Sequence, residues 1–142
     1  MSHARIVQAL KDLFNVSISE GSISGLLEQA SRYSSSEIAK ITNELQLSSV
    51  LGIDETGCKI NGNKHWYWTF QSTLNTLIVA NKSRGTKVID ATFTEGFKNA
   101  CVNHDNYSSY GSLECKSEQL CLAHKLRDLN YAIECDDTQV MN

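Results

Sequence analysis

The dipeptide Asn61-Gly62 constrains the fold of this chain more than any other feature. Asn-Gly is the preferred two-residue turn of a β-hairpin, because both residues adopt positive φ at little cost. The segment after the turn has the period of a β-strand, in which every second side chain faces the same way. One of its faces carries Trp66, Trp68 and Phe70. Such a face could stack nucleic-acid bases, but it more commonly packs into a core, so we predict a hairpin with one buried face.

Further strands are predicted on both sides of this hairpin. Residues 50–53 form a short apolar run before it, and residues 76–80 form another after a polar turn. Together with the hairpin, these segments predict a three-stranded antiparallel meander. A helix should follow, because Ile89, Phe93 and Phe97 repeat at a spacing of four residues.

Two aspartates follow strands that this order of elements can bring together. Asp54 follows the strand at residues 50–53, and Asp105 follows a further predicted strand at residues 99–104. The helix between them is a crossover connection, which allows the two strands to run parallel. If these strands are neighbours, the two carboxylates meet and can hold Mg²⁺ or Mn²⁺ for phosphodiester chemistry, although a lone Asp after a strand more commonly caps a turn. Glu55 would point to the opposite face and is the weaker candidate.

Cys121 and His124 have the spacing of half a zinc site. The remaining ligands could come from Cys115, Cys135 and His104, but the pair could equally be packing residues at the junction of a short strand and a C-terminal helix. The chain has five cysteines, an odd number, and no secretion signal. These features favour reduced thiols over a disulfide framework.

The first 47 residues are predicted to be helical. An apolar face that includes Ile6, Leu10 and Leu13 indicates one helix, and capping-box patterns at residues 17–20 and 34–37 indicate two further helix starts. Three short helices could form a DNA-binding helix-turn-helix, but none of them carries a cluster of Arg or Lys. We therefore divide the chain into a helical lead-in, residues 1–47, and a domain that occupies residues 48–142.

The overall composition excludes some classes of protein. A chain of 142 residues is long enough for one core, and no apolar run approaches the roughly 20 residues of a membrane-spanning helix. The formal net charge of −3 gives no overall attraction to DNA. We expect a cytoplasmic protein that has no membrane partner.

Five short motifs succeed one another along the chain. They are residues 48–57 (SSVLGIDETG), 63–70 (NKHWYWTF), 83–85 (SRG), 104–110 (HDNYSSY) and 119–127 (QLCLAHKLR). In this order they resemble the insertion sequence sixty-six family of bacterial transposases. Each motif alone is weak, but the five together are specific, and the resemblance covers nearly the whole chain.

The resemblance implies an α/β fold, with a partial ribonuclease-H-like mixed sheet flanked by helices and preceded by the N-terminal helical segment. It also implies an Asp-Asp-Glu triad that binds Mg²⁺, cuts DNA at the ends of the element and joins them to target DNA. Asp54 matches the first catalytic and metal-binding carboxylate, and Asp105 matches the second. Cys121 and His124 match a Cys-x-x-His signature of unknown role.

The sequence also departs from the family pattern. The third carboxylate has no counterpart before Asn142, since Glu134 comes too early, and the upstream DNA-binding segment and coiled coil are missing. We therefore expect a truncated transposase core that is inactive alone and binds Mg²⁺ or Mn²⁺ weakly. The alternative is a non-enzymatic transposon remnant or regulator that associates with full-length transposase. The expected partners are DNA and other transposase copies, at the bacterial nucleoid.

Overall fold

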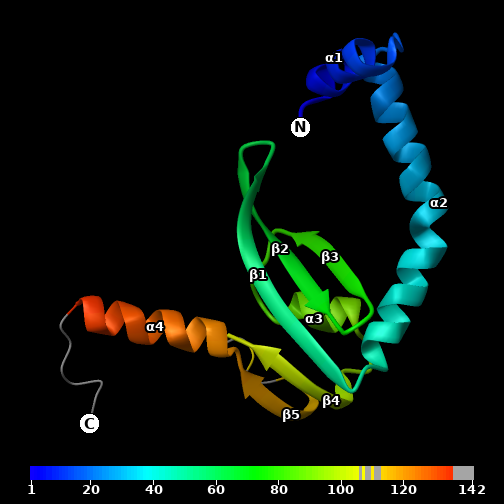
Figure 1. The fold of residues 1–142 in the computed structure, drawn as a ribbon. Coiled ribbons are helices and arrows are strands. Elements are labelled where there is room, and N and C mark those ends of the chain that lie inside the picture. The colour runs from blue at the N-terminus through cyan, green and yellow to red at the C-terminus, as the bar shows by residue number, and fades with distance from the viewer. Residues whose placement is uncertain (106, 108–109, 111–112, 136–142) are drawn as a thin grey trace. The chain divides into compact units, whose positions relative to one another are not determined.

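Helices come first along the chain and a sheet follows them (Figure 1). The computed structural model describes residues 1–105, 107, 110 and 113–135. Its elements are α1 (His3–Phe14), α2 (Glu20–Gln46), β1 (Val50–Ile60), β2 (Asn63–Gln71), β3 (Thr76–Asn81), α3 (Lys87–Thr92), β4 (Phe97–His104), β5 (Cys115–Leu120) and α4 (Leu122–Glu134). They fall into two compact units, Met1–Ala39 and Lys40–Asn142. A functional division at residues 47 and 48 stays a prediction. None of the described helices is long and apolar enough to cross a membrane.

The N-terminal region contains two helices instead of the predicted three. The helix start predicted at residues 34–37 is wrong, because α2 runs through this segment without a break. The Ser34 hydroxyl donates a hydrogen bond to the carbonyl oxygen of Ser31 at 3.2 Å, and the Ser35 hydroxyl donates one to that of Arg32 at 2.9 Å. Hydroxyls that bind to the preceding turn of their own helix do not cap a new one.

The strands form one mixed sheet in the order β3-β2-β1-β4-β5. Strands β1, β2 and β3 are the predicted antiparallel meander. Strand β4 pairs parallel with β1, and β5 pairs parallel with β4. This order, with helices before and between the strands, confirms the predicted α/β fold with a ribonuclease-H-like mixed sheet and an N-terminal helical segment.

The turn between β1 and β2 has the conformation that its sequence predicts. Asn61 and Gly62 have φ values of 50° and 77°, and both positive angles are required by a type I′ turn. The predicted buried face of β2 is also confirmed, because the side chains of Trp68 and Phe70 are fully buried. Tyr67, on the other face, is 40% exposed.

Helix α3 is shorter than the spacing of its aromatic residues predicts, and Phe97 begins strand β4 instead. The backbone turns at Gly96, where φ is 65° and a Cβ atom would lie 3.1 Å from the carbonyl oxygen of Glu114. The ring of Phe93 lies 4.8 Å from that of Phe70 and 4.9 Å from that of Phe97. The spacing of four residues therefore reflects a shared core and not one face of a helix.

The two faces of the sheet have different surroundings. One face is the core side, where Leu51 and Ile53 of β1 and Val102 of β4 are buried together with Val88 and Ile89 of α3. Alternate residues of the same strands face the other side. Asp54 lies on that second face, and so does the line of β4 residues that leads to Asp105.

Candidate metal centre

Asp54 and Asp105 line the same pocket, which has a volume of about 130 Å³. The parallel register pairs Gly52 of β1 with Asn103 of β4, so the two aspartates, each two residues further on, are level with one another. The other polar side chains around the pocket include those of Thr69, Gln71 and Asn103. The adjacency that was expected only from strand order is therefore present in the structure.

Each aspartate is oriented by one backbone hydrogen bond. Oδ1 of Asp54 accepts from the backbone N–H of Glu55 at 3.0 Å, and Oδ1 of Asp105 accepts from that of Tyr107 at 3.0 Å. Within the part of the chain that the structure describes, neither carboxylate forms an ion pair with Lys or Arg, and neither Oδ2 atom accepts a hydrogen bond. The two carboxylates thus place uncompensated negative charge around one small pocket.

This donor set suits a hard divalent cation. Mg²⁺ is commonly bound by one or two carboxylates, and water or substrate phosphate completes its shell. Asp54 and Asp105 provide two such carboxylates, whereas the described residues contain no group of three or more His, Cys, Asp or Glu side chains that could hold a metal ion. The two carboxylates therefore fit a cation whose remaining ligands come from solvent or substrate.

Cys121 and His124 lie in the same pocket as the aspartates. Cys121 caps α4, and its backbone N–H donates to the carbonyl oxygen of His104 at 2.8 Å, which fixes the start of α4 beside the end of β4. The neighbouring His124 side chain and the backbone N–H groups of the first helical turn lower the pKa of Cys121. The pKa of His124 is raised, chiefly by Cys121 and to a smaller extent by the negative charge of Asp54.

The sequence of the chain was compared with family models and with known proteins. The model described as Transposase IS66 family matches residues 1–142, the whole chain. The chain belongs to this transposase family. The match confirms the resemblance drawn from the five motifs, and it makes the chain a transposase-like domain of the Asp-Asp-Glu type. A search of curated proteins gave no match.

Several solved structures are similar to this IS66-family chain. The magnesium complex of the HTLV-2 integrase catalytic core domain, in its trimeric form, is 14% identical, covers 62% of this chain and 74% of its own, and has a TM-score of 0.41. The dimeric form of the same domain is also 14% identical. Its match covers 63% of this chain and 75% of that one, with a TM-score of 0.41. A simian T-cell lymphotropic virus intasome in complex with the PP2A regulatory subunit B56 gamma is 11% identical. The match covers 62% of this chain and 42% of that one, with a TM-score of 0.42.

The IS66-family chain also contains a buried polar network that the sequence analysis missed. The Glu55 side chain has no exposed surface, and its Oε1 atom lies 2.8 Å from Nε of Arg84. Its Oε2 atom accepts a hydrogen bond from the Tyr110 hydroxyl. Burial, followed by this hydrogen bond, raises the pKa of Tyr110, so the phenol stays a neutral donor. The available signal was the alternation of β1, which places Glu55 on the same buried face as Leu51 and Ile53 and so demands a partner.

This network joins β1 to the segment that follows β4. Glu55 directly follows Asp54 on β1, while the guanidinium carbon of Arg84 lies 3.8 Å from the centre of the Tyr107 ring. The backbone N–H of Tyr107 is the group that orients Asp105. A single arginine thus contacts the residue after Asp54 and the residue two positions after Asp105.

Glu134 lies at the opposite end of α4 from the pocket of the two aspartates. It is the last residue of α4, ten residues beyond His124. At 1.5 Å per residue, this distance along the helix is about 15 Å. The sequence-based view that Glu134 does not match the third family carboxylate is consistent with this geometry.

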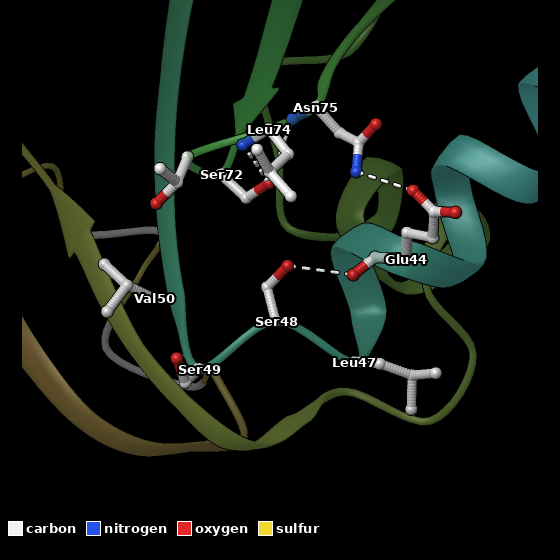
Figure 2. Close-up of a pocket in the computed structure, with 9 residues that line it drawn as sticks. Glu44, Leu47, Ser48, Ser49, Val50, Ser72, Leu74 and Asn75 are labelled. Carbon is white, nitrogen blue, oxygen red and sulfur yellow. Dashed lines mark hydrogen bonds between the residues drawn. The ribbon is translucent and has the colours of Figure 1, made fainter.

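A larger cavity, of about 510 Å³, lies next to the N-terminal end of β1 and the turn between β2 and β3 (Figure 2). Glu44 accepts a hydrogen bond from the side-chain amide of Asn75 at 2.8 Å, and the Ser48 hydroxyl donates to the Glu44 carbonyl oxygen. The exposed side chains of Leu47 and Leu74 also line it. Its one carboxylate is already engaged, so this cavity lacks the paired acids that phosphodiester chemistry needs.

Proposed function

We propose that Asp54 and Asp105 together hold Mg²⁺ or Mn²⁺ against a DNA phosphodiester, as the metal-binding part of a transposase active site. The observation that carries this proposal is the shared pocket of the two carboxylates. A cation there would supply the Lewis acidity that phosphodiester cleavage requires. The substrates would be transposon ends and target DNA, at the bacterial nucleoid, and copies of the protein would associate on them.

The residues of the chain have distinct parts in this proposal. Asp54 is held on the central strand β1, while the backbone N–H of Tyr107 turns Asp105 toward the same pocket. The His124 side chain lines the same pocket, and the negative charge of Asp54 contributes to its raised pKa. The Glu55–Arg84–Tyr110 network fixes the backbone behind both aspartates and acts through position alone.

Metal titration tests the site directly. Mn²⁺ is titrated calorimetrically into the wild type and into Asp54→Asn, Asp105→Asn and Asp12→Asn, the last being a matched control on the exposed helix α1. Asn preserves size and removes one charge, so each pocket variant should bind at least roughly tenfold more weakly. The control should bind like the wild type. Identical curves for all four proteins would refute the proposed site.

A second candidate function is non-catalytic association with full-length transposase. It is favoured because the residues that line the pocket include two carboxylates, those of Asp54 and Asp105, whereas an Asp-Asp-Glu site uses three. A plasmid-cleavage assay with Mn²⁺ separates the two functions. Cleavage that is lost in Asp105→Asn supports the enzyme, whereas metal binding without cleavage supports the associated, non-catalytic protein.

A further inference from the structure

One segment of the chain carries basic residues and no acidic ones. Residues 56–89 contain five of the thirteen Lys and Arg residues and none of the sixteen Asp and Glu residues. Because the formal net charge is −3, this segment carries +5 and the rest of the chain carries −8. The basic residues are Lys59, Lys64, Lys82, Arg84 and Lys87. An overall acidic protein therefore has a distinct basic region.

Much of this region is a hairpin that extends past the rest of the sheet (Figure 1). Strands β1 and β2 pair with each other from Gly52 to Ile60. However, β4 pairs with β1 only at residues 50–52, and β3 pairs with β2 only at residues 66–71. Among the described residues, no further strand pairs with residues 57–65, which we call the hairpin arm.

Three lysines supply the unpaired charge of the hairpin arm and its base. Lys59 and Lys64 lie on the arm, and Lys82 directly follows Asn81, which pairs with Trp66 at the base of the arm. None of these lysines forms an ion pair with a carboxylate in the part of the chain that the structure describes. Their charges are therefore available to an external anion.

Trp66 organises the base of the arm. The Nζ atom of Lys64 lies 4.8 Å from the centre of the Trp66 ring, and the guanidinium carbon of Arg84 lies 4.7 Å from it. Glu55 neutralises Arg84, whereas Lys64 is exposed. Cation–π contact on the ring restricts the Lys64 side chain before any ligand binds, which lowers the entropy cost of binding.

The arm continues the strand that carries Asp54. Lys59 lies five positions beyond Asp54 on β1, about 17 Å along the strand at about 3.4 Å per residue. Lysine side chains bind backbone phosphates without reading sequence.

We propose that the hairpin arm and Lys82 bind the phosphate backbone of the duplex DNA on which Asp54 and Asp105 act. This inference rests on the proposed function only for the identity of the polyanion as DNA. The arm would position the duplex, and the aspartates would act on it.

The test measures how binding depends on salt, in EDTA, so that no metal site is involved. Fluorescence anisotropy of a labelled duplex is recorded between 50 and 200 mM KCl for the full chain and for the triple variant Lys59→Gln, Lys64→Gln, Lys82→Gln. Each lost phosphate contact lowers the slope of log K against log salt by about 0.9, so the three substitutions together should lower it by about 2.7. The matched control replaces three exposed lysines outside the arm by Gln, namely Lys11, Lys98 and Lys116. It should lower the slope by less than about 0.9, the value of one phosphate contact.

The outcomes separate this inference from the proposed function. An equal loss in both triple variants, with circular dichroism showing that both are folded, would mean that only overall charge matters and would overturn the inference. Competition by polyglutamate as strong as that by DNA would indicate an acidic protein partner and would also overturn it. A third outcome is that the salt dependence of DNA binding falls in the arm variant alone, while the metal titration gives identical curves for all proteins. This outcome supports the arm and refutes the metal site.

Discussion

Glu55→Gln should destabilise the protein strongly, although the substitution preserves side-chain size. The carboxylate has no exposed surface and receives Arg84 on one oxygen and Tyr110 on the other. Removing one partner of a buried ion pair costs about 3–5 kcal/mol, because the other charge is left without compensation. The Arg84 side chain is 34% exposed, and water can partly solvate its charge. We therefore expect the lower end of this range, about 3 kcal/mol.

Urea unfolding measures this loss. The chain has two tryptophans, Trp66 and Trp68, and both lie on β2, so intrinsic fluorescence reports on the sheet. With a slope of about 2 kcal/mol/M, a loss of about 3 kcal/mol lowers the midpoint by about 1.5 M. Glu114→Gln is the control, because Glu114 pairs with Lys98 at 3.8 Å on the surface, where both side chains are about three-quarters exposed. Its effect should stay below about 0.5 kcal/mol.

A double-mutant cycle with Arg84→Met shows whether the charges interact. If the pair is formed, the double variant should lose less than the sum of the two single losses, by about 1–3 kcal/mol. The reasoning is refuted if Glu55→Gln costs less than about 1 kcal/mol. It is also refuted if the two losses simply add.

The remaining predictions concern a pKa, a thiol and a turn. The folded-state pKa of Tyr110 is raised above 10, so its contribution to stability is complete below pH 10 and is lost as the pH rises further. The free energy of unfolding should therefore fall less steeply above pH 10 in Tyr110→Phe than in the wild type. Cys121, with its lowered pKa, should react faster with iodoacetamide at pH 7.5 in the wild type than in His124→Ala, as followed by mass spectrometry. Gly62→Ala should cost about 1–2 kcal/mol in urea unfolding, because φ is 77° there.

Each of these three predictions can fail clearly. Equal alkaline destabilisation of the wild type and Tyr110→Phe would show that the phenol is not held neutral by the fold. An unchanged rate of Cys121 alkylation in His124→Ala would mean that the imidazole does not activate the thiol. Unaltered stability of Gly62→Ala would contradict the left-handed turn.

The sequence predicts the parts of the fold that local chemistry determines. Asn61-Gly62 defines a turn that needs two positive φ angles, and the alternation after it defines the buried face of β2. The wrong predictions arise where one sequence pattern is compatible with two local structures. Ser34 resembles a helix cap but binds to its own helix, and Phe97 continues a helical spacing while it packs from a strand.

Part of the candidate site depends on pairing over long distances and could not be derived locally. The proximity of Asp54 and Asp105 followed from a crossover connection, because parallel strands carry level residues to one place. The presence of Thr69 and Gln71 in the pocket depends on the register of the hairpin. The partners of Glu55 lie 29 and 55 residues away, and no local pattern indicates them.

The neighbouring acids Asp54 and Glu55 point to opposite sides of β1, and only three residue pairs join this strand to β4. Because side chains alternate along a strand, a slip of one position would exchange them, burying the aspartate and sending the glutamate to the pocket. Arg84 and Tyr110 each contact one oxygen of the Glu55 carboxylate, and the position of these contacts suits the length of a glutamate side chain. A slipped register would lose both contacts and leave Arg84 without its partner, so the network stabilises the correct register of β1 in the free protein.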